Sequence, residues 1–184
     1  GNTVEFGATA GGPYTIGSGA NYHHLIISGA ATKNVVANPT NLAGNLTINN
    51  GSTFNSNGSN ITVAGDWINN LGGSFTPGTR TVTFNGSLNN QTIFPPGGGQ
   101  TFADLTINNT FAGGIVTASG NVSITVGRTL TMTSGIFDMG TNTLGQTGAA
   151  NFTATGGDLR LAKTGVTLPE LTSTYNITGG TITF

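Results

Sequence analysis

The sequence predicts an all-β fold, a right-handed parallel β-helix (β-solenoid) in which the chain winds into three-sided coils of about 22 residues. Three observations predict this fold. Strand-like patterns recur at steps of seven or eight residues, glycine or asparagine separates them, and charged residues make up only 6% of the chain. Glycine, at 31 of 184 residues, and asparagine suit the corners, where a positive φ angle is often needed.

The principal apolar residues keep this spacing in two long stretches. They lie at Leu46, Phe54, Ile61, Ile68, Phe75 and Val82, and again at Val122, Leu130, Phe137, Leu144, Phe152, Leu159 and Val166. A coiled coil shares the seven-residue period, but the intervening Gly, Asn, Thr and Ser residues are poor helix formers. The alternation Thr-Leu-Thr-Met-Thr at Thr129–Thr133 indicates instead a short strand, which a tight turn follows.

Three such steps close one coil, so residues about 22 apart are expected to stack in neighbouring coils. The expected stacked pairs are Leu46 with Ile68, Phe54 with Phe75, Ile61 with Val82, Leu130 with Phe152, Phe137 with Leu159, and Leu144 with Val166. An antiparallel sandwich is the alternative, but its turns recur at longer intervals of about 8–12 residues. The shorter step therefore favours the solenoid.

Two phrases recur within the sequence. Leu-Thr-Ile-Asn-Asn occurs at Leu46–Asn50 and Leu105–Asn109, at an offset of 59. A second phrase, Thr-Val-x-Phe or Thr-Ile-x-Phe, occurs at offsets of 78 and 100, at Thr3–Phe6, Thr81–Phe84 and Thr181–Phe184. A duplicated domain requires a single offset, so the repeating unit is the coil itself, with connections of variable length.

We expect a single solenoid domain over residues 1–184, which is open to being a segment of a longer repeat protein. The N-terminal part, 1–44, has wider spacings between apolar clusters and is expected to be less regular. The prolines in the segment 94–100 lack the backbone donor that an inner strand needs, so this segment is expected to be a loop inserted between coils.

Composition narrows the classes of function. The formal net charge of −1 gives no electrostatic footprint for nucleic acid or for an anionic membrane. No apolar run reaches the roughly 18 residues that membrane insertion as a helix requires. The sequence has no cysteine, which excludes disulfides and thiolate chemistry. Since no catalytic constellation stands out, we expect no enzyme activity and no bound cofactor or metal.

Three aromatic residues are candidates for contact with a ligand or partner. Trp67 precedes Ile68, which is expected to face inward, so alternation predicts an exposed Trp67. Tyr14 and Tyr22 would extend such a surface into one on which sugars stack. The alternative for Trp67 is packing against the loop near Pro95.

Charged and imidazole side chains offer few further candidates. Asp138 and Asp158 lie close to one coil apart, and a polysaccharide lyase would use clustered carboxylates to hold Ca²⁺. The favoured interpretation is an ion pair between Asp138 and Arg160. His23 and His24 are adjacent and are expected on opposite faces of a strand, where they do not share a metal ion.

Threonines also fall at the coil spacing. Thr131 and Thr133 lie 22 residues before a second Thr-x-Thr run, Thr153–Thr155, so adjacent rows are expected on one face. Rows of this kind order water in some ice-binding proteins. Because Thr174 and Asn176 follow in the next coil, the row is expected to degrade after about two rungs, and threonine is in any case a common outward residue of strands. Ice binding therefore ranks third among the functions.

Four segments, Thr81–Gly86, Asn90–Ile93, Asp104–Asn109 and Gly127–Gly135, resemble the repeats of large secreted bacterial surface proteins. These are the right-handed parallel β-helix adhesin-like arrays frequent in Bacteroidetes, and the resemblance covers most of residues 80–145. It implies export, a cell-surface or matrix location, and a role in adhesion or filament building. It carries over no catalytic residues.

The leading hypothesis is a structural extracellular protein, a β-solenoid segment or subunit of a bacterial surface adhesin, array or filament. Its end coils are expected to stack head to tail on a further repeat or another copy, because a bare final coil exposes an unpaired strand edge. The residues expected at these contacts are Thr3, Val4, Phe6, Thr181, Ile182 and Phe184. The alternative is a carbohydrate-binding or polysaccharide-lyase-like β-helix, with surface glycans as the partner.

Overall fold

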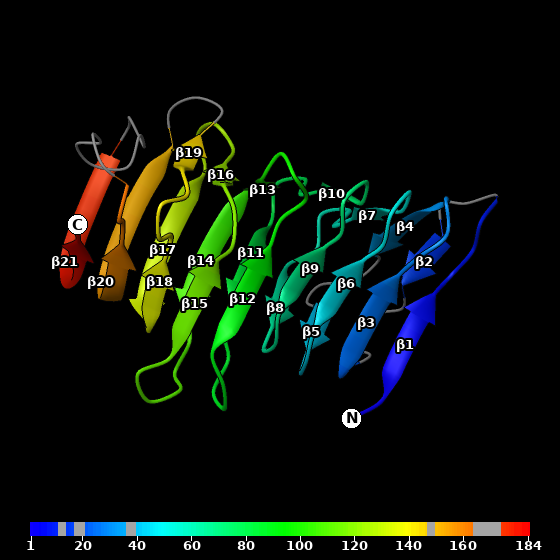
Figure 1. The fold of residues 1–184 in the computed structure, drawn as a ribbon, viewed down its shortest axis with the longest axis horizontal. Coiled ribbons are helices and arrows are strands. Elements are labelled where there is room, and N and C mark those ends of the chain that lie inside the picture. Colours follow the sequence, from blue (N-terminus) through cyan, green and yellow to red (C-terminus); the bar gives the residue numbers. More distant parts are fainter. Residues whose placement is uncertain (11–13, 17–20, 36–39, 147–149, 164–173) are drawn as a thin grey trace.

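The computed structural model describes residues 1–10, 14–16, 21–35, 40–146, 150–163 and 174–184. Its described part is all-β, and the strands follow one another along the long axis of the molecule (Figure 1). Every strand pair is parallel, and the stacked sheets form a β-solenoid of about 7 turns with about 22 residues in each turn. The predicted fold class is therefore confirmed.

The strands form three faces, and each full coil of the described chain contributes one strand to each face. The first face contains β1 (Thr3–Phe6), β3 (His24–Ile27), β6 (Leu46–Ile48), β9 (Trp67–Asn69), β12 (Gln91–Phe94), β15 (Ile115–Ala118) and β18 (Ile136–Asp138). The second face contains β2 (Tyr14–Ile16), β4 (Thr32–Val35), β7 (Thr53–Asn55) and β10 (Ser74–Thr76), then β13 (Gln100–Phe102), β16 (Val122–Ile124) and β19 (Leu144–Gln146). The third face contains β5 (Thr40–Leu42), β8 (Ile61–Val63), β11 (Thr81–Phe84), β14 (Asp104–Asn108) and β17 (Thr129–Ser134).

Two longer strands, β20 (Asn151–Arg160) and β21 (Thr174–Thr183), extend the third face and then the first. β20 pairs with β17 through its first half and with β18 through its second half, which joins these two faces into one 14-stranded sheet. The strand turns the corner at Gly157, whose φ of 78° is a left-handed conformation that costs glycine little.

The pairing register tests the expected stacking directly. Four expected pairs are confirmed, namely Phe54 with Phe75, Ile61 with Val82, Leu130 with Phe152 and Phe137 with Leu159. One is wrong by a single residue, because Leu46 pairs with Trp67 and not with Ile68. The pair of Leu144 with Val166 lies outside the described residues.

The N-terminal part and the proline segment both fit into the coils. Thr3 pairs with His24 and Leu25 with Leu46, so the register over 1–44 is the same 21 residues that separates Leu46 from Trp67. Residues 95–99 connect β12 to β13 within one coil, so they form a corner and not a loop between coils.

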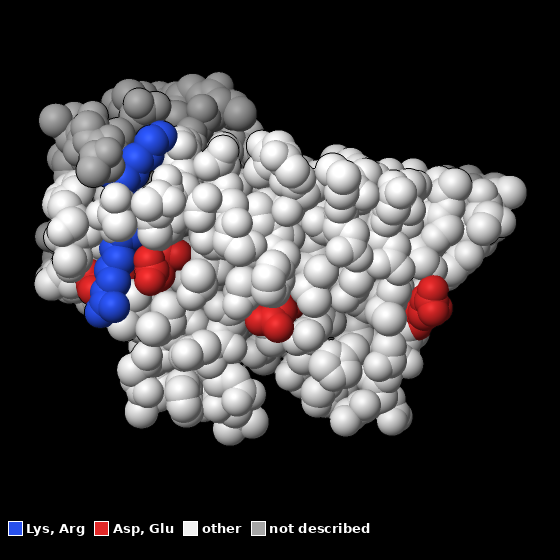
Figure 2. Space-filling view, in the orientation of Figure 1, with Lys and Arg blue, Asp and Glu red and all other residues white. Residues whose placement is uncertain are grey.

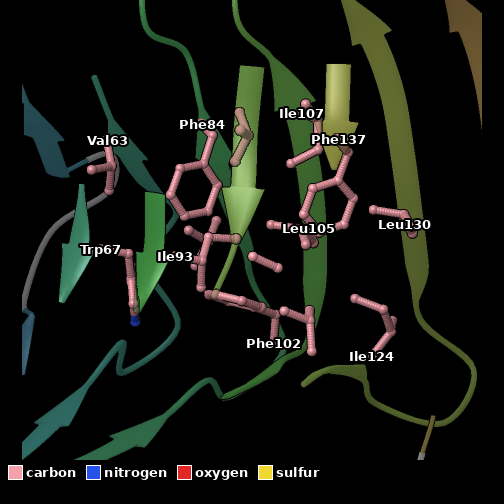
Figure 3. Packing of buried hydrophobic residues seen from close by; sticks show 14 of the residues in the cluster. Val63, Trp67, Phe84, Ile93, Phe102, Leu105, Ile107, Ile124, Leu130 and Phe137 are labelled. Carbon is pink, nitrogen blue, oxygen red and sulfur yellow. The ribbon is translucent and has the colours of Figure 1, made fainter. Parts of the chain in front are cut away.

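The core lies inside the three faces (Figure 3). Inward positions are buried while their neighbours along each strand are partly exposed, as the alternation requires. The ring of Trp67 lies edge-on to Phe75 and Phe102, with centroid distances of 4.7 and 5.2 Å. Phe102 also packs edge-on to Phe84 at 6.2 Å. Aromatic residues from all three faces thus meet in the middle of the solenoid.

A buried glutamine fixes the corner between β11 and β12. The Nε2 atom of Gln91 donates to the carbonyl oxygens of Val63 and Gly65 at 2.8 and 2.7 Å. Its Oε1 atom accepts from the backbone of Gly86 at 2.8 Å and from Asn109 at 3.1 Å. All the hydrogen-bonding groups of this amide are satisfied, so its burial is not destabilising.

Replacing Phe102 by alanine is expected to lower the free energy of unfolding by about 3–5 kcal/mol, because it leaves a cavity against Trp67 and Phe84. Leu88→Ala is the control, since Leu88 is 77% exposed and its truncation is expected to change stability by less than about 0.5 kcal/mol. Urea unfolding followed by circular dichroism measures both. Equal effects would contradict the central packing of Phe102.

Candidate interaction surfaces

Trp67 is not a surface residue, and the expectation that it is exposed is wrong. Its side chain is 0% exposed, and its Nε1 atom donates to Oε1 of Gln100 at 3.1 Å. Gln100 Oε1 also accepts from Asn69 at 3.0 Å, so the indole and two amides form one buried polar contact. The expected packing partner, the segment near Pro95, is replaced by the core aromatic residues. Trp67 is therefore unavailable to a ligand on the surface.

Tyr14 and Tyr22 lie at the N-terminal end of the solenoid and do not extend a surface from Trp67. Tyr14 is 38% exposed on β2, and its hydroxyl donates to the carbonyl oxygen of Ala10 at 2.6 Å. Tyr22 is half-buried, and its ring packs edge-on to Phe6 with a centroid distance of 6.3 Å. Both tyrosines belong to the first coil, where they are placed to contact whatever covers that end.

Asp138 and Arg160 are neighbours in the strand register, but the expected ion pair between them is wrong. Arg160 Nε lies 2.7 Å from Oδ2 of Asp158 instead. Asp138 Oδ1 accepts from the backbone N–H of Gly140 at 2.8 Å and so closes its own turn. The carboxylate of Asp158 also accepts from the hydroxyls of Thr181 and Thr183, at 2.7 and 2.9 Å. Asp158 therefore fastens β21 to β20.

These contacts change the titration of Asp158. Burial by itself raises the pKa of this carboxyl, but the hydrogen bonds from Arg160, Thr181 and Thr183 outweigh burial and leave the pKa lowered. A carboxyl whose pKa is lower in the folded state stabilises that state above its ordinary pKa. That contribution is lost as the pH falls through the lowered value. Acid is therefore expected to loosen the last strand.

Hydrogen exchange within residues 174–184 tests this expectation. Between pH 5 and pH 2.5 the protection of these amides is expected to fall by about 1–2 kcal/mol, beyond the change in intrinsic exchange rate. Asp158→Asn is expected to remove that protection already at pH 5. Asp104→Asn is the matched control, because Asp104 pairs with Arg128 away from β21. An unchanged β21 in Asp158→Asn would contradict the fastening role.

His23 and His24 do not diverge to opposite faces as expected, because their ring centroids are only 4.3 Å apart. Nδ1 of His24 accepts from the backbone N–H of Asn45 at 3.0 Å. Burial, together with the positive charges of the N-terminus and of His24, lowers the pKa of His23. Within the described ranges, no group of three or more His, Asp or Glu side chains is placed to hold a metal ion.

Lys33 is a buried cation that the sequence did not single out. Its side chain on β4 is 0% exposed, and its Nζ atom donates to four backbone carbonyl oxygens. These belong to Ala8 at 2.9 Å, Ala31 at 2.7 Å, Gly29 at 3.2 Å, and Ser28. Burial lowers its pKa. Three of the four carbonyls come from residues 28–31, so the ammonium organises this corner and ties it to the first coil.

Lys33→Met keeps the length of the side chain but removes the donor to those carbonyls. It is expected to lower the free energy of unfolding by about 2–3 kcal/mol, because buried carbonyl oxygens lose their partner. Lys163→Met is the control, since Lys163 is exposed and contacts only the hydroxyl of Thr143 at 2.6 Å. Thermal unfolding of the two variants compares them. A neutral or stabilising Lys33→Met would show that the buried charge costs more than its contacts contribute.

Both ends of the solenoid expose residues that belong to the inward series. Phe152 and Ala154 are buried, but the residues that pair with them on β21, Tyr175 and Ile177, are 36% and 48% exposed. Phe184, two positions after Ile182, is 67% exposed. At the other end, Val4 and Phe6 continue the series of Leu25 and Ile27 and are half-buried, while Thr3 and Thr181 face outward. Each end is therefore an open cross-section of the core.

The third face carries a longer row of threonines than expected. Thr62, Thr83, Thr106, Thr131 and Thr153, here called the threonine column, pair as neighbours on five consecutive strands. Asn41 precedes the column and Asn176 follows it. The expected pairing of Thr131 with Thr153 is confirmed, but the expected end of the row after about two rungs is wrong. Thr133 is turned away, because its hydroxyl donates to the carbonyl oxygen of Ile107 at 3.0 Å.

The surface hollows in the described part of the chain are small. One of about 280 Å³ lies at the C-terminal end and is lined by Asp138, Arg160, Leu161, Ala162, Thr183 and Phe184. Another of about 280 Å³ lies beside the first rungs of the third face and is lined by Asn21, Asn41, Leu42, Ala43, Thr62, Ala64, Asn85 and Ser87. Trp67, Tyr14 and Tyr22 line neither hollow, so the predicted sugar-stacking groove is not formed there. Figure 2 shows that charged side chains make only isolated patches on the visible face.

Comparison of the chain with protein-family models, with curated proteins and with solved structures gave no match. A search of the described residues for a helix with the length and hydropathy of a membrane span found none. The inference of function therefore starts from the ends of the solenoid and from its outward faces.

Proposed function

We propose that this chain is a structural unit of a secreted bacterial surface adhesin, array or filament, and that further coils continue its solenoid at both ends. The single observation that carries the proposal is the exposure of inward-series residues in the end coils. Ile177 is 48% exposed and Phe184 is 67% exposed, although every preceding residue in their columns is buried. Apolar surface of this kind at a sheet end favours association with a complementary end.

The two ends are complementary in register. In a second copy that continues the solenoid, Val4 would follow Ile182 and Phe6 would follow Phe184, because these residues occupy the same columns of the first face. On the third face, Ile177 would meet Tyr22, since Tyr22 bridges to Leu42 at the start of that column. Apolar residues would thus meet apolar residues at each inward position.

Backbone hydrogen bonds support the same contact. Within the described residues, β1 pairs only with β3, and β21 pairs only with β20, so each has one edge of unpaired N–H and C=O groups. Stacking would place the two edges about 4.8 Å apart, the ordinary strand spacing. Glu5 would lie opposite Thr183, and no pair of like charges would meet there.

The extracellular location is supported by composition. The chain has no cysteine and few charges, and its uncharged outward positions are rich in threonine and asparagine, as in the secreted arrays that the sequence resembles. The proposal includes no catalytic role. Adhesion would follow from the display of long lateral faces, while the end coils provide length.

Sedimentation velocity and electron microscopy of the 184-residue chain test the stacking. The unsubstituted chain is expected to associate with rising concentration into unbranched rods whose width is that of one solenoid. Ile182→Lys and Val4→Lys each place a charge in the contact and are expected to give monomers, because an unpaired charge is costly to bury. Leu88→Lys is the control, since Leu88 is 77% exposed and away from both ends. A chain that stays monomeric, or variants that associate equally well, would contradict end-to-end stacking.

A further inference from the structure

The threonine column carries an inference that does not depend on how the ends associate. In the described chain, the hydroxyls of Thr83, Thr106, Thr131 and Thr153 have no hydrogen-bond partner within the protein. This distinguishes them from Thr133, which bonds a backbone carbonyl, and from Thr62, whose hydroxyl donates to Oδ1 of Asn41 at 2.6 Å. Four consecutive rungs therefore present hydroxyl groups to the surroundings.

The column is rigid and evenly spaced. Each member lies at the middle of a strand that is paired on both sides, so its backbone is fixed by the ladder. Threonine is branched at Cβ and has few χ1 rotamers in a strand, so its hydroxyl and methyl groups keep their places. The strand spacing repeats these groups about every 4.8 Å, which gives a line of about 19 Å over five rungs.

The surroundings of the column exclude several ligand classes. Asp104 is the charged outward residue of the described strands of this face, and it is neutralised by Arg128 at 2.6 Å. The outward positions next to the column are Asn60, Ala64, Thr81, Asn85, Asp104, Asn108, Thr129, Thr133, Asn151 and Thr155, which include no aromatic residue. A charged polymer would find no counter-charge here, and a sugar chain would find no ring on which to stack.

A ligand that matches the column must be uncharged and rigid, and it must repeat hydrogen-bonding groups at the strand spacing. The oxygen atoms of hexagonal ice repeat at nearly that interval, and each can accept or donate a hydrogen bond. The threonine methyls between the hydroxyls disfavour disordered water and favour a cage-like arrangement of water molecules. We infer that the third face binds ice, with the threonine column as the contact line.

The proposal predicts that the unsubstituted protein is taken up into a slowly growing ice hemisphere, produces thermal hysteresis and shapes ice crystals. Thr106→Tyr and Thr131→Tyr place a bulky ring in the middle of the column, and each is expected to remove most of the hysteresis, at least fivefold at equal concentration. Thr117→Tyr is the matched control, because Thr117 is an exposed outward threonine of β15 on the first face. It is expected to keep full activity.

Two further measurements keep the test decisive. Circular dichroism verifies that each variant folds, and Thr106→Val replaces the hydroxyl by a methyl group of the same shape where tyrosine is not tolerated. Exclusion of the unsubstituted protein from ice, or an equal loss in Thr117→Tyr and Thr106→Tyr, overturns the proposal. Running the assays on the monomeric Ile182→Lys variant separates this inference from end-to-end stacking, since the column is intact there.

Discussion

In-register parallel pairing between coils is the constraint on which the rest of this structure depends. Each residue stacks on the residue at the same position of the next coil, about 4.8 Å away, so every position becomes a column. Like charges in one column would repel by about 1–3 kcal/mol at each step. The few charged residues accordingly stack on uncharged or opposite ones, as Asp104 does on Thr81 and Asp138 on Arg160. The low charge of the chain follows from its geometry.

The sequence was sufficient to predict the solenoid, the coil length and four stacked pairs, because apolar residues repeat wherever the coil is regular. It failed at Trp67, since Trp67 and Ile68 are both apolar neighbours and alternation alone cannot choose between them. The choice is made by tertiary contacts that the local pattern does not contain. The indole reaches Gln100 and the aromatic core, and neither lies near it in sequence.

The length of the threonine column was missed for a different reason. A constant step of 22 places no threonine under Thr131, whereas the true partner, Thr106, lies 25 residues earlier. The extra residues are accommodated at the corners before β12 and β15, which extend beyond the sheets in Figure 1. Lys33 was missed as well, because nothing in its neighbours along the chain announces that four carbonyls will surround its ammonium.

The direction of the inter-coil hydrogen bonds gives the solenoid a mechanical property. These bonds run along the rod, so tension between its ends loads the coil interfaces in series and peels the coils off one at a time. A coil of 21 residues, the register between Leu25 and Leu46, occupies about 5 Å of the rod but extends to about 70 Å when released. The fold can thus lengthen many times over under load while the remaining coils stay intact.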